Sequence, residues 1–244
     1  MIDLSNETAL VTGGTRNIGL SIAKNLKAAG ARVGIIGGSD PEALKKAIKT
    51  LKGGDGDVIG MLANVADEKA VIGAYDKIEA GLGPVSILIN GAAKRPHEPL
   101  KEISRESWNA VLDVILTGAF FTSRELFTRL PQERRGSIIN IGGLSAHRPA
   151  RDRAHVISAK AGLVGLTRAL AEEGLGRIRV NCVVPGVIST QRLPDQNPPQ
   201  FDENSKYASG TPEDVARAVT ALADPRDVYV TGQILHVNGG RLMP

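Results

Sequence analysis

Residues 9–30 read ALVTGGTRNIGLSIAKNLKAAG. The first part is apolar and ends in two glycines, and the second part carries apolar residues at helical spacing up to Gly30. This order predicts a β-strand, a glycine turn and an α-helix. Backbone N–H groups at such a turn can approach an anion at the positive end of the helix dipole, as they do for the pyrophosphate of a dinucleotide. Glycine turns of this kind also occur without a ligand, so the stretch alone leaves both interpretations open.

Short apolar runs continue along the chain, with amphipathic segments between most of them. These runs are ARVGIIGG, DVIGML, SILIN, GSIINIGG, RIRVNCVVPG and QILHVNGG. Such alternation is typical of parallel strands joined by crossover helices, and continuously apolar strands indicate a sheet that is covered on both faces. We therefore predict an α/β fold with a doubly wound parallel sheet, in a single domain that spans residues 1–244.

Composition limits the class of protein. The 244 residues are 42% apolar and 23% charged, which is typical of a globular domain. The net charge is +4, but the basic residues are scattered and only 3% of residues are aromatic, so a nucleic-acid partner is not expected. The N-terminal residues do not resemble a signal peptide, and no apolar run approaches the roughly 18 residues of a membrane span. We predict a cytoplasmic protein.

Cysteine and histidine give no sign of a metal centre. The single cysteine, Cys182, lies in an apolar run and is expected to pack as a small hydrophobic side chain rather than to act as a reactive thiol. The four histidines lack paired metal-ligand spacing, so no metal site is expected. They are His97, His147, His155 and His236.

The stretch from residue 187 to residue 210, VISTQRLPDQNPPQFDENSKYASG, breaks the alternating pattern. It combines prolines and polar residues and shows no periodicity. Long irregular connections inside a compact domain are often functional, which favours a substrate or lid loop here. A surface loop without a function is the alternative.

Five motifs occur in a familiar order. They are TGGTRNIG (12–19), ANVAD (63–67), INGAA (89–93), RVNCVVPG (179–186) and TGQILHVNGG (231–240). With them the chain resembles the short-chain dehydrogenase/reductase family over nearly its whole length, and in particular the 3-oxoacyl-carrier-protein reductases. The resemblance implies a Rossmann-type sheet of about seven strands, a bound NAD or NADP, and a homo-oligomer, either a tetramer or a dimer.

The resemblance also implies which residues contact the cofactor. These are Gly13, Thr15, Arg16, Asn17, Ile18, Gly19, Asn64, Val65, Asn90, Gly91, Ala92, Lys160, Pro185, Gly186, Ile188 and Thr190. Some of these positions depart from the family pattern. Asn17 replaces the second glycine of the turn, and Gly91 and Ala93 stand where asparagine and glycine are common.

The sequence after the second apolar run favours NADP(H) over NAD(H). Enzymes that use NAD usually place an acidic side chain there to bind the ribose 2′-hydroxyl, whereas this chain has Gly37, Gly38 and Ser39. Arg16 resembles the family's NADP-associated arginine, and its guanidinium suits a phosphate.

The family's catalytic set is incomplete in this chain. Counting from Lys160, which is retained, the tyrosine position holds Val156, the serine position holds Gly143 and the asparagine position holds Ile115. Loss of a general acid typically costs about a hundred- to ten-thousand-fold in rate, so standard catalysis should be impaired. Candidate substitutes for the proton donor are His155, Ser145 and Tyr207.

Basic residues flank the predicted active site. Lys94 follows the fourth strand, and Arg148 and Arg151 precede the helix of Lys160, so we predict that they bind an anionic small molecule. A solvated loop balanced by Asp152 is the alternative. The predicted function is that of an NADP(H)-binding oxidoreductase acting on a carbonyl or alcohol group with impaired chemistry. The alternatives are a non-redox enzyme for elimination or carbon–carbon cleavage, and a non-catalytic sensor or partner subunit.

Overall fold

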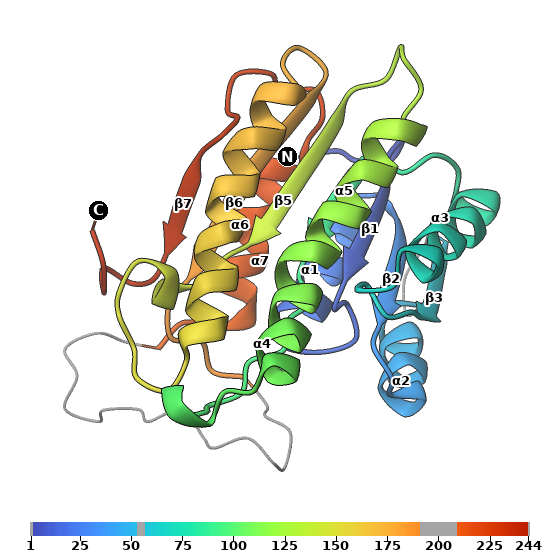
Figure 1. Ribbon diagram of the computed structural model, residues 1–244. Coiled ribbons are helices and arrows are strands. Elements are labelled where there is room, and N and C mark those ends of the chain that lie inside the picture. Colours follow the sequence, from blue (N-terminus) through green and yellow to red (C-terminus); the bar gives the residue numbers. More distant parts are fainter. Residues whose placement is uncertain (1, 53–56, 191–208, 244) are drawn as a thin grey trace.

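The computed structural model describes residues 2–52, 57–190 and 209–243. Within them the seven predicted apolar runs all form strands. The strands are β1 (Thr8–Thr12), β2 (Arg32–Gly37), β3 (Val58–Leu62), β4 (Ile87–Asn90), β5 (Gly136–Ile141), β6 (Ile178–Pro185) and β7 (Ile234–Val237). They form one parallel sheet in the order β3-β2-β1-β4-β5-β6-β7, which confirms the doubly wound fold (Figure 1).

Helices connect successive strands and cover both faces of the sheet. They are α1 (Asn17–Ala28), α2 (Pro41–Leu51), α3 (Glu68–Leu82), α4 (Arg105–Leu112), α5 (Gly118–Arg129), α6 (Ala154–Glu173) and α7 (Pro212–Ala223). Between α4 and α5 the chain forms a π-helical turn, Asp113–Thr117, and short 3-10 turns occur at Leu100–Glu102 and Leu144–Ala146. In Figure 1, α4, α5 and α6 pass in front of the sheet, while α1 and α7 lie behind it.

Alternating strand residues divide the core into two layers. In β1, Ala9 and Val11 pack in the layer with α1 and α7, whereas Leu10 packs in the layer with α3 and α5. The five central strands are almost completely buried, as their continuous apolar runs predict. The edge strands β3 and β7 are only partly buried, because each has a neighbour on one side alone.

Side-chain hydrogen bonds cap the starts of α2, α3, α4 and α7, but not that of α1. Asp40 accepts a hydrogen bond from the Ala43 amide at the start of α2, and Asp67 accepts from two amides at the start of α3. At α1 the preceding residue is Arg16, whose side chain does not cap the helix, and the first turn contains no acidic residue. The positive end of α1 therefore remains suited to an external anion.

Candidate cofactor and active site

The candidate site lies where the strand order reverses. β1 pairs with β2 on one side and with β4 on the other, and the helices that follow β1 and β4 cover opposite faces of the sheet. A crevice at the carboxyl ends of such strands is the usual ligand site of an open α/β sheet. The turn from β1 to α1 and the loop after β4 meet at this point.

The glycine turn is closely packed and needs its glycines. Gly13 has a φ of +68°, and a Cβ atom there would lie 2.8 Å from the Gly91 carbonyl oxygen. A Cβ atom at Gly19 would lie 2.1 Å from the Gly13 carbonyl oxygen. Thr12 joins the turn to the neighbouring loop, since its hydroxyl accepts hydrogen bonds from the Gly91 amide at 3.0 Å and the Ala92 amide at 3.2 Å.

Asn17 takes a left-handed conformation with a φ of +47°. Asparagine tolerates this region better than most residues, which explains how the turn is kept without the family's second glycine. Thr15 packs against the end of β2, and a Cβ atom at Gly37 would lie 2.7 Å from its methyl group. Ile18 packs against the core layer of α1. The turn is therefore anchored on both of its sides.

The structure places the other predicted cofactor residues around the same edge of the sheet. Asn64 is exposed and accepts a hydrogen bond from the Ala66 amide at 3.1 Å, and Val65 is buried against the start of α5. Pro185 ends β6. The segment after it is pinned by hydrogen bonds between residues 187–189 and Gly210, and a parallel bridge pairs Ile188 with Gly210. Thr190 is partly buried beside the residues that lie outside the described part of the chain.

The Asn90 side chain has a structural role that the motif does not reveal. Its amide nitrogen donates to Asn140 Oδ1 at 2.9 Å and to the Ser123 hydroxyl at 3.1 Å, and its oxygen accepts from the Thr122 hydroxyl at 2.7 Å. Asn140 in turn donates to the Thr167 hydroxyl at 2.9 Å. Asn90 is therefore committed to a buried network that ties β4 and β5 to α5 and α6, and only its main chain remains to face a cofactor.

Asp40 lies beside the predicted cofactor residue Arg16, a contact that the sequence motifs do not reveal. Arg16 Nη2 lies 2.5 Å from Asp40 Oδ2, so a carboxylate does stand beside the arginine expected to bind the 2′-phosphate. The carboxylate directly follows the stretch Gly37 to Ser39, which itself carries none. The pattern of an aspartate before a proline-led helix, which predicts an N-cap, could have located it.

Two of the three positions at which the sequence predicts altered catalytic residues lie in one apolar cluster. Ile115, on the π-helical turn, is 2% exposed, and Val156, on α6, is 1% exposed. The buried members of this cluster are Val111, Ile115, Ala119, Val156, Ala159 and Leu163. Neither position offers a polar group. The third position, Gly143, has space beside it, because the three atoms nearest to a Cβ there would be Lys160 Cγ at 3.8 Å, Lys160 Cδ at 3.9 Å and the Ser145 hydroxyl oxygen at 3.9 Å.

Lys160 lies on α6 one turn after Val156, and its side chain is buried. Its ammonium group donates a hydrogen bond to the carbonyl oxygen of Ile141, at the end of β5, at 2.5 Å. Burial, reinforced by the positive charge of Arg95, lowers the pKa of Lys160 to about 8, while Cys182 has the opposite effect. The same environment raises the pKa of the buried Cys182 thiol to about 11, so this cysteine is not a thiolate at neutral pH.

The pKa of Lys160 predicts a pH-dependent cost of folding. Because the pKa is about 8 in the folded chain and 10.5 as a model value, the unfolded chain binds more protons between these two pH values. The free energy of unfolding should therefore rise, relative to Lys160→Met, by on the order of 3 kcal/mol as the pH increases from 8 to 10.5. Denaturant unfolding of both proteins across this range measures the difference, and Lys24→Met, at an exposed lysine of α1, controls for the loss of one charge. Parallel curves for wild type and Lys160→Met would contradict the prediction.

Comparisons with known proteins identify the family. The family model described as Enoyl-(Acyl carrier protein) reductase matches residues 13–241. The chain is 34% identical over 247 residues to the 3-oxoacyl-(acyl-carrier-protein) reductase FabG of Escherichia coli (strain K12), covering 99% of this chain and 100% of the relative. This chain belongs to the short-chain dehydrogenase/reductase family.

Other similar proteins agree with this assignment. The FabG reductase of Rickettsia bellii is 36% identical over 248 residues and covers both chains completely. A dehydrogenase/reductase of Sinorhizobium meliloti has a TM-score of 0.89 at 32% identity, with 98% of this chain and 96% of that chain covered. A blue fluorescent protein from a metagenomic library, solved in complex with NADPH, has a TM-score of 0.87 at 29% identity and covers 99% and 100%.

The candidate substitutes for the family's tyrosine differ in their positions. His155 is completely buried, and its Nε2 atom lies 3.5 Å from the Glu98 carboxylate, so its ring is enclosed and not open to a substrate. Ser145 is better placed, since its hydroxyl lies beside the space at Gly143. Tyr207 lies outside the described residues, as does most of the predicted 187–210 loop.

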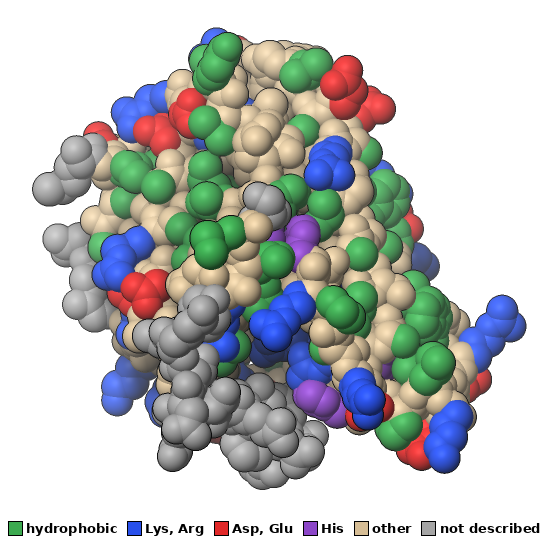
Figure 2. All heavy atoms as spheres, turned by 90° about the vertical axis from the view of Figure 1, so that its left-hand side faces the viewer, with side chains coloured by type: hydrophobic (Ala, Val, Ile, Leu, Met, Phe, Trp, Pro, Cys, Tyr) green, Lys and Arg blue, Asp and Glu red, His purple; other side chains and the backbone are tan. Residues whose placement is uncertain are grey.

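The predicted anion-binding residues lie on two loops that touch. Lys94 belongs to the loop after β4, and Arg148 and Arg151 belong to the loop after β5; all three are exposed. The Glu98 amide donates to the Asp152 carbonyl oxygen at 2.8 Å and so joins the two loops. Figure 2 shows Lys and Arg side chains gathered in its lower half, the side at which the strands end in Figure 1.

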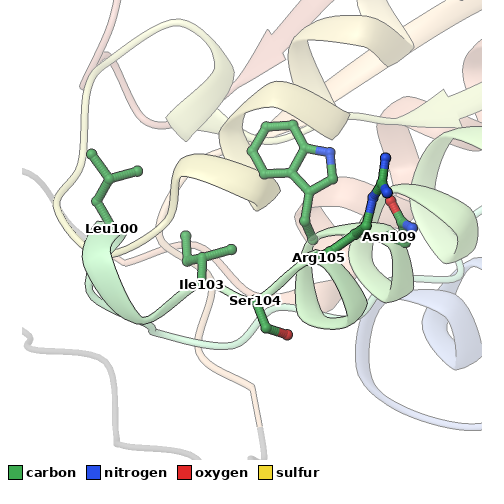
Figure 3. Close-up of a pocket in the computed structure, with 6 residues that line it drawn as sticks. Leu100, Ile103, Ser104, Arg105 and Asn109 are labelled. Atoms are coloured by element: carbon green, nitrogen blue, oxygen red, sulfur yellow. The ribbon is translucent and has the colours of Figure 1, made fainter.

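A surface hollow of about 400 Å³ borders the start of α4 (Figure 3). It is lined by Leu100, Ile103, Ser104, Arg105, Trp108 and Asn109. None of these residues belongs to the predicted cofactor or catalytic positions of this dehydrogenase/reductase. The hollow is therefore not part of the predicted cofactor site at the glycine turn.

Two histidines that are distant in sequence meet in the fold. The rings of His147, after β5, and His236, on β7, pack edge to face with centroids 4.6 Å apart. Burial lowers the pKa of both imidazoles, and the His147 pKa is lowered further by His236 and Arg168.

Among the described residues, no group of three or more possible metal ligands comes together. The described helices also include none that is long and apolar enough to cross a membrane.

Proposed function

We propose that this chain binds NADP(H) at the turn between β1 and α1 and is an oxidoreductase whose standard reaction, on a carbonyl or alcohol group of an anionic small molecule, is strongly impaired. A functional parallel is provided by the 3-oxoacyl-(acyl-carrier-protein) reductases to which it is similar. The proposal separates two properties that normally occur together in the family, namely nucleotide binding and proton transfer.

The residues of the turn fit a dinucleotide. Gly13 and Gly19 let the backbone of the turn pack closely, and the uncapped start of α1 offers amides and a positive dipole end to a pyrophosphate. Arg16 suits a 2′-phosphate, and the NADPH complex of a similar structure supports the same preference. A bound nicotinamide would supply or accept a hydride.

The observation that carries the proposal is the apolar cluster around Ile115 and Val156. Reduction of a carbonyl requires a proton donor close to the substrate oxygen, and the positions at which the family places its asparagine and tyrosine are occupied here by packed hydrocarbon. Gly143 likewise offers no hydroxyl to hold the oxygen. Lys160 remains, and we propose that it serves chiefly to hold the cofactor.

We further propose that the substrate carries a negative charge. Arg148 and Arg151 make no ion pair with another described residue and lie on a loop that touches the loop of Lys94. A guanidinium group binds carboxylates and phosphates in a bidentate manner, which suits a small acid or a phosphate-bearing conjugate. Charge reversal at Arg148 or Arg151 should weaken binding of such ligands.

A non-catalytic sensor or partner subunit is the second candidate. Large apolar side chains are exposed on or near the edge strand β7, including Tyr229 at 94%, Met243 at 81% and Leu235 at 41%. An edge strand with exposed apolar side chains favours association with another chain, and we propose a homo-oligomer as the default assembly.

One assay series distinguishes these functions. The purified protein is titrated with NADPH and then supplied with small ketones and ketoacids while the nicotinamide absorbance is followed. We expect saturable binding with slow but measurable carbonyl-dependent oxidation. Substrate loss without any change at the nicotinamide would instead support a non-redox enzyme, and binding without turnover of any compound would support the sensor or partner subunit. Brisk reduction of ordinary ketones would refute the proposal.

A further inference from the structure

Two charged side chains meet where the 2′-position of a bound nucleotide is expected. Arg16 follows β1 and immediately precedes α1, and Asp40 follows β2 and immediately precedes α2. Because β1 and β2 are paired in parallel, the starts of both helices lie at the same edge of the sheet. Arg16 Nη2 and Asp40 Oδ2 are 2.5 Å apart, which brings the guanidinium into direct contact with the carboxylate.

The second oxygen of Asp40 fixes the carboxylate in place. Oδ1 accepts a hydrogen bond from the Ala43 amide at 2.9 Å, the N-cap bond of α2. This bond, followed by the hydrogen bond and charge of Arg16, holds the pKa of Asp40 below its usual range despite some desolvation, so the group is ionised at neutral pH. The Asp40 carboxylate, which the Ala43 amide holds in place, therefore already balances the positive charge of the Arg16 guanidinium.

We propose that Asp40 is a specificity-determining residue, which holds the Arg16 guanidinium in competition with the 2′-phosphate of NADP(H) and so narrows the preference for NADP(H) over NAD(H). This inference rests on the proposed dinucleotide binding. Its physical basis is charge. A 2′-phosphate must displace or share the Asp40 contact and approach a carboxylate of its own sign, whereas the neutral 2′-hydroxyl of NAD(H) does neither.

Asp40→Asn tests the inference with little structural cost. Asparagine is as good an N-cap as aspartate, so α2 should keep its start while Arg16 loses its counter-charge. Because half-exposed ion pairs contribute little individually, we expect NADPH to bind about three- to tenfold more tightly and NADH to change by less than about twofold. Fluorescence titration at fixed ionic strength measures both dissociation constants without any turnover.

Two further variants establish that the effect passes through Arg16. Asp214→Asn removes a comparable exposed aspartate in the first turn of α7, which is paired with Arg217 at 2.5 Å, and should leave both affinities unchanged. In an Arg16→Ala background, Asp40→Asn should give a smaller gain than in the wild type, and the difference is the coupling of the two residues. An equal gain in NADPH affinity in both backgrounds would contradict the proposal that Asp40 acts by holding Arg16. It would mean that Asp40 repels the phosphate directly.

Other outcomes are equally decisive. Weaker NADPH binding by Asp40→Asn would mean that Asp40 orients Arg16 for the phosphate, the opposite of the proposal, and unchanged NADPH binding would also overturn it. If neither wild type nor Asp40→Asn bound NADPH or NADH, the proposed function itself would fail. The failure of the inference and that of the proposed function are therefore distinguishable.

Discussion

Gly19→Ala is expected to weaken NADPH binding about ten- to a hundredfold, because the new Cβ atom would lie 2.1 Å from the Gly13 carbonyl oxygen. The nearest atoms to this Cβ belong to the backbone of Gly13 and Gly14. The clash can therefore be relieved only if the glycine turn moves away from the first turn of α1. That movement would displace the amides that we propose to bind the pyrophosphate. Fluorescence titration with NADPH measures the loss, and circular dichroism of the same samples reports whether the fold is kept.

Two matched variants separate this effect from general effects of glycine substitution. Gly165→Ala, on the exposed face of α6 with no atom within 4 Å of the added Cβ, should stabilise the helix by about 0.5–1 kcal/mol and leave NADPH binding unchanged. Asn17→Gly restores the family's glycine at a φ of +47° and should bind NADPH at least as tightly as the wild type. Wild-type affinity in a folded Gly19→Ala protein would place the nucleotide elsewhere.

Restoring the family's catalytic residues should give the largest gain in activity. We expect Ile115→Asn, Gly143→Ser and Val156→Tyr together to raise NADPH-dependent reduction of small ketones by about a hundred- to ten-thousand-fold, the usual contribution of a general acid. A Cβ atom at Gly143 would lie at ordinary contact distance, 3.8 Å or more, from its nearest neighbours. Ile115 and Val156 pack in the same cluster, so the smaller asparagine makes room for the larger tyrosine.

A phenylalanine control isolates the hydroxyl group. The triple variant with Val156→Phe in place of Val156→Tyr has almost the same shape and the same packing strain, which is expected to cost about 1–3 kcal/mol in both proteins. Thermal unfolding should therefore be similar for the pair, while the rates of ketone reduction should differ strongly. Equal rates with retained NADPH binding would mean that the pocket no longer positions a ketone beside the nicotinamide.

The sequence alone predicted the sheet and the glycine turn because both depend on local patterns. Continuous apolar runs are typical of strands in a parallel sheet that is covered on both faces, and all seven runs form strands of the predicted sheet. The strand-turn-helix sequence at residues 9–30 is equally local, and Gly30 ends α1 with a φ of +99° as a helix-terminating glycine does.

Side-chain partners across the fold could not be predicted in the same way. The sequence predicted that Ile115 and Val156 stand at catalytic positions, but only tertiary packing reveals that they share one apolar cluster. The direction of the Asn90 side chain depends on Thr122 and Asn140, which come from a different helix and strand. The contact between Arg16 and Asp40 likewise follows from the pairing of β1 with β2, not from their separation in the sequence.

The central claim is that a dinucleotide binds beside a site that lacks its proton donor. A single experiment tests both parts: NADPH is added to the purified wild-type protein until its fluorescence saturates, and an excess of a small ketoacid is then added while absorbance at the nicotinamide band is followed. The account predicts a saturable fluorescence change and an absorbance that falls only slowly. No saturation at millimolar NADPH, or rapid loss of absorbance on addition of the ketoacid, would contradict it.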